Sequence, residues 1–220
     1  MANKTYITIP YRNRIDCIIK QSIYLQYFLE AENLNNSVFI NYVEQKEDVF
    51  NIAFIINVGF KIIEQHILDN DNYWFLPVDV LPTKINFETE DNKVLCTASG
   101  KSHAFKCKDF KKINGYTLKQ YGYGFDDHEL RKRCEHYGLS LSNWGGLDYA
   151  ENSNIYKFIY LESKQKTGTR HMENYKKNRN LLDNHFNPQN DGLNSMDFEI
   201  TDRFMLHPNI AYNQFIIKKP

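Results

Sequence analysis

Apolar residues in the first half of the chain alternate between helical and extended spacing. Spacing of three to four residues predicts a helix over residues 15–31, with strands before and after it at 6–10 and 37–44. A largely apolar helix is expected at 51–68, followed by a buried strand at 73–76. The first helix is indicated by Ile15, Ile18, Ile19, Ile23, Tyr27 and Leu34. Successive strand–helix units predict an α/β fold, with a mainly parallel central sheet flanked by helices.

The second half is less regular. A short helix is expected at residues 108–112, and a second over 126–137, stopped by Gly138. A strand is expected at 155–161, with surface connections at 142–154 and 163–169. Because no internal repeat or linker interrupts the chain, all 220 residues are expected to form a single domain.

Charge and cysteine content narrow the classes of function. Lys plus Arg and Asp plus Glu are both 27, so no net field favours a nucleic acid or a membrane surface. The four cysteines stand far apart, which argues against a zinc site or a disulfide framework and favours a reducing compartment. No leader segment and no membrane span are recognisable, so a cytoplasmic location is expected.

Gly122 and Gly124 alternate with aromatic residues, and Asp126 and Asp127 follow directly. Aromatic faces beside paired carboxylates suit a sugar, because a ring covers its CH face and carboxylates accept from its hydroxyls. One carboxylate is also able to take a hydroxyl proton. The alternative is a glycine-rich turn with an Asp at a helix N-terminus.

Arg12, Arg14 and Asp79 follow predicted strands. Ligands of open α/β sheets bind at the carboxyl ends of the strands, so these three residues are candidates for a binding site. The alternative is a pair of arginines in a solvated turn.

Six blocks in the same order resemble the β-1,4-galactosyltransferases, glycosyltransferase family 7. The resemblance covers about residues 5–200 and rests on residues 9–14 (IPYRNR), 50–60, 75–82 (FLPVDVLP), 113–115 with 122–127, His171 and 191–195 (DGLNS).

This resemblance implies a GT-A glycosyltransferase fold. About residues 1–100 would bind the nucleotide sugar and the metal, about 101–200 the acceptor, and 201–220 would be a C-terminal extension. The implied reaction is an inverting, metal-dependent transfer of a hexose or N-acetylhexosamine from a UDP-sugar donor to a saccharide or glycoconjugate acceptor. Galactose and N-acetylgalactosamine are the sugars expected most, and Mn²⁺ or another divalent cation is the expected cofactor.

The resemblance also implies roles for single residues. Asp79 and His171 match the metal ligands, and Asp127, next to Asp126, matches the general base. An ungapped alignment puts Thr97 where galactose-selective members carry a tyrosine, so the donor pocket is expected to accept an N-acetyl group. Expected donor contacts are Pro10, Arg12, Arg14, Phe50, Asp79, Thr97 and Gly100. Expected acceptor contacts are Tyr123, Gly124, Phe125, Asp126 and Asp127.

Several family residues are replaced in this chain. Pro77 stands for the first Asp of the metal segment, Gly168 for a methionine ligand, Ile52 for an arginine and Tyr123 for a tryptophan. These changes leave two alternatives open, a non-catalytic protein that binds sugar nucleotides and a nucleotide-sugar hydrolase. A nucleic-acid-binding role for the basic run 176–179 is disfavoured against a solvated helix face.

Overall fold

The computed structural model describes residues 3–46, 49–97, 102–122, 124–142, 157–161 and 172–217. The strands are β1 (Thr5–Tyr11), β2 (Val38–Gln45), β3 (Asn72–Phe75), β4 (Val80–Lys84), β5 (Lys93–Thr97), β6 (Ser102–Lys106), β7 (Ser140–Ser142), β8 (Lys157–Tyr160), β9 (Phe198–His207) and β10 (Ile210–Ile217). The helices are α1 (Ile15–Ala31), α2 (Ile52–Ile63), α3 (Cys107–Lys112), α4 (Asp126–His136), α6 (Met172–Asn184) and the 3₁₀ turn η1 (Leu193–Ser195).

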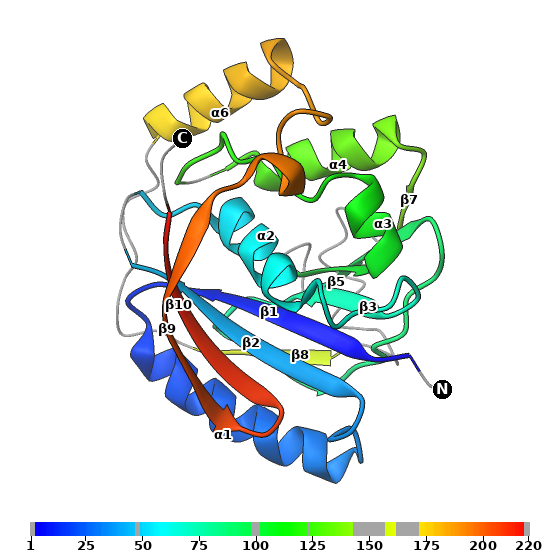
Figure 1. The fold of residues 1–220 in the computed structure, drawn as a ribbon, viewed down its shortest axis with the longest axis vertical. Coiled ribbons are helices and arrows are strands. Elements are labelled where there is room, and N and C mark those ends of the chain that lie inside the picture. The colour runs from blue at the N-terminus through cyan, green and yellow to red at the C-terminus, as the bar shows by residue number, and fades with distance from the viewer. Residues whose placement is uncertain are drawn as a thin grey trace.

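A central sheet in the order β7-β5-β6-β3-β1-β2-β10-β9 organises the molecule. Its middle strands β3, β1, β2 and β10 run parallel, whereas β6 and β9 pair antiparallel with their neighbours β3 and β10. Helix α1 covers one face, and α2, α3, α4 and α6 lie on the other side (Figure 1). The expected α/β fold with a flanked, mainly parallel sheet is confirmed in this centre.

Residues 198–217 form two strands of the central sheet, in the stretch 201–220 that the sequence analysis expected to be a C-terminal extension. Strand β10 runs parallel to β2, with Tyr212 opposite Tyr42, and β9 forms the edge. Ile210 and Phe215 of β10 are 1% and 0% exposed, on cores at opposite faces of the sheet. Apolar burial on both faces therefore makes this segment part of the domain.

Helix α1 has the predicted bounds but packs with a different face. Ile15, Ile19 and Ile23 are more than half exposed, at 54%, 53% and 53%. The buried side of the helix is formed by Cys17, Ile18, Gln21, Leu25 and Leu29. The polar Gln21 interrupts this buried row. The row was therefore not recognised from the sequence, because the periodicity counts only apolar positions.

Helix α2 lies close to β1 and ends at Ile63, five positions before the predicted end at residue 68. Its start is capped by Asn51, whose side chain accepts from the Phe54 amide at 2.9 Å. A Cβ at Gly59 would come within 2.1 Å of the Thr8 hydroxyl oxygen, so only glycine permits this helix–strand distance.

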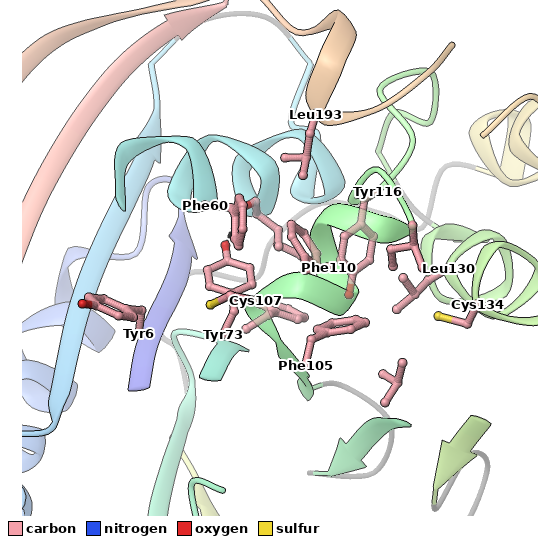
Figure 2. Packing of buried hydrophobic residues seen from close by; sticks show 14 of the residues in the cluster. Tyr6, Phe60, Tyr73, Phe105, Cys107, Phe110, Tyr116, Leu130, Cys134 and Leu193 are labelled. Atoms are coloured by element: carbon pink, nitrogen blue, oxygen red, sulfur yellow. Dashed lines mark hydrogen bonds between the residues drawn. The ribbon is translucent and has the colours of Figure 1, made fainter. Parts of the chain in front are cut away.

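The core between α2, α3 and α4 is aromatic (Figure 2). Phe60, Tyr73 and Phe110 meet with ring centroids 4.8–4.9 Å apart, and Leu130 and Cys134 bring α4 onto the same cluster. This packing fixes the helix that starts with Asp126 against the sheet.

Strands β4 and β8 form a separate antiparallel pair, and β8 falls within the strand predicted at 155–161. The predicted connections at 142–154 and 163–169 lie outside the described residues, except for Ser142, which ends β7. Within the described part of the chain, no helix has both the length and the apolar character needed to cross a membrane.

Candidate functional site

Two residues from separate sequence blocks meet where β1 and β3 end. Arg14 follows β1, and its Nη1 donates to Oδ2 of Asp79 at 3.0 Å. The two side chains are 20% and 34% exposed, so the pair is accessible from solvent. A guanidinium has several donors in a fixed fork, so Arg14 is able to hold Asp79 and a phosphate together.

The turn that carries Asp79 is held by α1. The Val80 amide donates to the Pro77 carbonyl at 3.2 Å, closing the turn. The buried Gln21 side chain donates from Nε2 to the carbonyls of Pro77 at 2.9 Å and Val80 at 2.6 Å. Sequence reasoning missed Gln21, although a glutamine in the buried row of a helix was an available signal.

The Asp79 carboxylate is suited to serve as an oxygen ligand of a hard divalent ion. Its Oδ2 is held by Arg14, and its Oδ1 accepts no hydrogen bond from the described residues. His171 and Gly168 lie outside the described residues, so the second metal position stays a prediction. Among the side chains that are described, no cluster of three or more His, Cys, Asp or Glu residues is close enough to hold a metal.

The glycine-rich loop turns back on the start of α2. Gly122 and Gly124 have φ values of 73° and 95°, in the region where a Cβ causes strain. The Gly122 amide donates to the Phe50 carbonyl at 2.9 Å. A predicted donor contact, Phe50, is thus joined through its backbone to the predicted acceptor loop.

Asp126 and Asp127 form the first turn of α4, as predicted. Burial, together with the adjacent Asp127 carboxylate, raises the pKa of Asp126 from 3.8 to about 6. The Asp127 Oδ1 accepts from the His128 amide at 2.9 Å. The first turn of α4 thus offers two carboxylates that are able to accept hydrogen bonds from a sugar hydroxyl.

The charge of Asp127 also influences the pKa of His103 in the central sheet. Burial lowers the pKa of His103 to about 4, and the negative charge of Asp127 opposes this shift. His103 pairs with Phe75 across β6 and β3, and its Nδ1 lies 2.7 Å from the Tyr116 hydroxyl. His103 thus lies opposite Phe75, the last residue of β3, the strand that leads to Asp79.

Two further blocks of the resemblance are bonded to each other and to α4. The Leu193 amide donates to the Asn114 carbonyl at 2.9 Å, so residues 113–115 and 191–195 interlock. Arg133 of α4 is fully buried; it pairs with Glu129 at 2.7 Å and donates to the Asp191 carbonyl, also at 2.7 Å. This buried charge network anchors the helix that begins at Asp126.

The basic run 176–179 belongs to α6. Lys176, Lys177 and Arg179 are exposed, which agrees with the solvated helix face expected from the sequence. Asn178 is 3% exposed and donates to the carbonyls of Tyr121 and Gly124. The sequence offered no signal for this residue beyond its place within a charged run.

The remaining predicted residues are only partly placed. Pro10 is buried in β1, and Arg12 is partly exposed in the turn after it. Thr97 ends β5, but its side chain lies outside what is described, as do Gly100, Tyr123 and His171. The roles of these residues therefore stay predictions.

A family model described as "N-terminal domain of galactosyltransferase" matches residues 97–158. Xylosylprotein 4-beta-galactosyltransferase of Caenorhabditis elegans is 26% identical over 184 residues, which cover 76% of this chain and 62% of that protein. Beta-1,4-galactosyltransferase 1 of Bos taurus is 25% identical over 162 residues, covering 64% and 38%. The chain thus spans 62% and 38% of the length of these two curated relatives.

Among solved structures, the chain resembles the catalytic domain of Drosophila β-1,4-galactosyltransferase 7 in complex with xylobiose. The TM-score is 0.76 at 17% sequence identity, and the match covers 100% of this chain and 96% of the other. A mutant of the same enzyme in complex with manganese, UDP-Gal and xylobiose matches with a TM-score of 0.72. At this identity the likeness shows a common fold, the GT-A fold expected from the sequence.

Proposed function

We propose that this chain belongs to the β-1,4-galactosyltransferase family and is a UDP-sugar-dependent glycosyltransferase. It transfers galactose or N-acetylgalactosamine to a saccharide hydroxyl with inversion at the anomeric carbon. The donor is a UDP-sugar, the cofactor is manganese, and the acceptor is a saccharide or glycoconjugate.

One observation carries this proposal: Arg14 and Asp79 pair just after β1 and β3, and the helix that begins with Asp126 and Asp127 packs on the core cluster to which β3 contributes. Arg14 and Asp79 meet at 3.0 Å, after the ends of β1 and β3. Asp126 and Asp127 begin α4, and the loop before them is bonded to Phe50 through the Gly122 amide. Phosphate recognition and hydroxyl activation are thus supplied by neighbouring elements of one domain.

The donor side binds the leaving group. Arg12 and Arg14 hold the diphosphate by charge-assisted hydrogen bonds, and Phe50 lies against the uracil, assisted by Pro10 and Gly100. Asp79 and His171 would hold the divalent ion, because a carboxylate oxygen and an imidazole nitrogen are ligands that suit manganese. When bound, the ion supplies positive charge beside the diphosphate, where negative charge builds as UDP leaves.

The acceptor side activates the hydroxyl. Tyr123, Gly124 and Phe125 hold the acceptor sugar, and Asp127 accepts the hydroxyl proton. The acceptor oxygen forms a bond to the anomeric carbon on the face opposite UDP, and the bond from that carbon to the diphosphate oxygen breaks. This single displacement gives inversion without a sugar–enzyme intermediate.

The donor sugar is selected near Thr97. Threonine is smaller than the tyrosine of galactose-selective members, so the pocket accepts an N-acetyl group at C2. One such contact is worth about 1–3 kcal/mol, which gives a preference and not an absolute choice. Replacing Thr97 with Tyr should shift the turnover ratio towards UDP-galactose; an unchanged ratio would remove Thr97 from the donor pocket.

The decisive experiment is a panel of UDP-sugars with manganese. Each is scored by thermal shift and by UDP release with xylobiose, N-acetylglucosamine or no acceptor. Acceptor-dependent UDP release supports the transferase, whereas release without acceptor would indicate a hydrolase. Stabilisation by UDP and manganese without turnover would indicate a non-catalytic binding protein, the alternative raised by Pro77 and Gly168.

A second measurement tests donor recognition. Replacing Arg12 and Arg14 together by Ala should raise the UDP dissociation constant by about 10- to 1,000-fold, because each charge-assisted bond contributes about 1.5–3 kcal/mol. Unchanged UDP affinity in the folded double variant would contradict the assignment of these arginines.

We propose a reducing compartment, in agreement with the cytoplasmic location expected from the sequence. All four cysteines are free and buried, so none is paired in a disulfide.

The expected absence of a nucleic-acid partner stays a prediction, and a gel-shift assay with mixed oligonucleotides would test it.

A further inference from the structure

Asn178 differs from its neighbours on α6. Lys176, Lys177 and Arg179 are exposed to solvent, whereas Asn178 is 3% exposed. A buried amide side chain is stable only when its polar atoms are hydrogen-bonded, so its partners indicate what it holds in place.

Its partners lie on both sides of the glycine-rich turn. Nδ2 donates to the Tyr121 carbonyl at 3.1 Å and to the Gly124 carbonyl at 2.9 Å. The Tyr121 amide donates back to Oδ1 at 3.4 Å. One side chain therefore joins two backbone carbonyls that are three positions apart. Among the described residues of the loop, no backbone hydrogen bond joins these two positions.

The loop also packs directly on α6. A Cβ at Gly122 would lie 2.5 Å from Nδ2 of Asn174, and a Cβ at Gly124 would lie 2.7 Å from Cδ2 of Tyr175. The two glycines thus allow the backbone to approach the helix closely enough for Asn178 to reach it.

Phe125, the next residue, has a φ of 71°. This left-handed conformation is unfavourable for a residue with a bulky side chain and persists only where surrounding contacts enforce it. The contacts are the Asn178 bond to the preceding carbonyl and the Phe125 ring, 4.6 Å from the Tyr175 ring. Phe125 in turn precedes Asp126, so its conformation sets where α4 begins.

We propose that Asn178 is a positioning residue for the acceptor site. It holds Tyr121 and Gly124 of the glycine-rich loop and the left-handed Phe125, and through them it directs Asp126 and Asp127 towards the acceptor. It does not contact either substrate. The inference rests on the proposed glycosyltransferase function, because the loop is assigned there to the acceptor.

The test replaces Asn178 with Asp, which keeps the volume and removes both donated bonds. The control makes the same change at Asn180, an exposed residue of the same helix whose Oδ1 accepts a hydrogen bond from Nδ2 of Asn184 at the surface. Three quantities are compared: the KM of the best acceptor of the panel, the dissociation constant of UDP with manganese, and the hydrogen-exchange rate of the Gly122 amide. That amide reports loop opening, because it donates to the Phe50 carbonyl.

Asn178→Asp should raise the acceptor KM by about 10- to 100-fold, should speed exchange at Gly122 about 10-fold, and should leave UDP affinity within about twofold. The Asn180 variant should match the wild type in all three. Exchange at Gly122 equal to that of the control, or UDP affinity falling in step with the acceptor KM, would overturn the proposal.

If Asn178→Asp does not fold, Asn178→Ser, which keeps one hydroxyl donor, is measured in its place. Failure of the wild type to transfer any sugar would refute the function, and exchange at Gly122 would still decide whether Asn178 holds the loop.

Discussion

Replacing Asp126 with Asn should make the protein more stable while it removes a carboxylate from the site. Folding raises the pKa of Asp126 from 3.8 to about 6, because burial and Asp127 penalise its charged form. One pKa unit corresponds to about 1.4 kcal/mol, so above pH 6 the ionised carboxylate lowers stability by about 3 kcal/mol. Loss of a negative charge at the start of α4 offsets about 0.5 kcal/mol of the gain. The net expectation is a stabilisation of about 2–3 kcal/mol at pH 8.

The sign of the pH dependence follows from the same shift. Between about pH 4 and pH 6 the folded state binds more protons than the unfolded state, so wild-type stability falls as pH rises through this window. Below about pH 4 Asp126 is protonated in both states, and the gain from Asn disappears. The advantage of the variant should therefore grow from near zero at low pH to its full value above pH 6.

The assay is urea unfolding of wild type and variant at several pH values from 4 to 8. The control is Glu135→Gln, because Glu135 is an exposed carboxylate of the same helix, paired with Arg131 at 2.8 Å. The control should show no comparable pH-dependent gain, since an exposed ion pair contributes about 0–1 kcal/mol. An Asp126→Asn variant that is equally stable relative to wild type at pH 4 and pH 8, or destabilised at pH 8, would refute the reasoning.

Three further predictions concern the turn that carries Asp79, the packing of α2 on β1, and the metal. Gln21→Leu removes both hydrogen bonds that Nε2 donates to the Asp79 turn, and it should lower the free energy of unfolding by about 2–3 kcal/mol and weaken UDP–manganese binding. Urea unfolding and calorimetry measure the two effects, and Gln26→Leu on the same helix is the control. Gly59→Ala puts a Cβ 2.1 Å from the Thr8 hydroxyl and should destabilise by about 1–3 kcal/mol, so a variant as stable as wild type would contradict the close packing of α2 on β1. Chelation by EDTA should abolish transfer, manganese should restore it better than calcium, and Asp79→Ala should not respond to manganese; full metal-dependent activity in that variant would exclude Asp79 as a ligand.

Local chemistry in the sequence was enough to predict several elements, most of them in the first half of the chain, but not β4 to β7, α6, β9 or β10. The bounds of α1 agree with the prediction for residues 15–31, and α4 begins at Asp126 as expected. Gly122 and Gly124 were expected in a tight turn, and both have positive φ values. These features depend on propensity and on the backbone freedom of glycine, which act over a few neighbouring residues.

Long-range pairing was not predictable in the same way. In the sheet, β10 lies beside β2, although the two strands are far apart in the sequence. The sequence pattern of β10 does not indicate which strand it pairs with. The face of α1 was misjudged because Gln21 interrupts its buried apolar row. Burial depends on what the rest of the chain brings against a residue, so tertiary context overrides a local pattern.

The sequence by itself determined the fold class, the family resemblance, and the identity of Arg14, Asp79, Asp126 and Asp127 as candidate groups. Only the tertiary structure decided which of them meet and what holds them. Arg14 reaches Asp79 across 65 positions of sequence, and Asn178 reaches Gly124 across 54. The physical reason is that a hydrogen bond requires its two atoms to lie within about 3 Å of each other, and the three-dimensional path of the chain sets that distance.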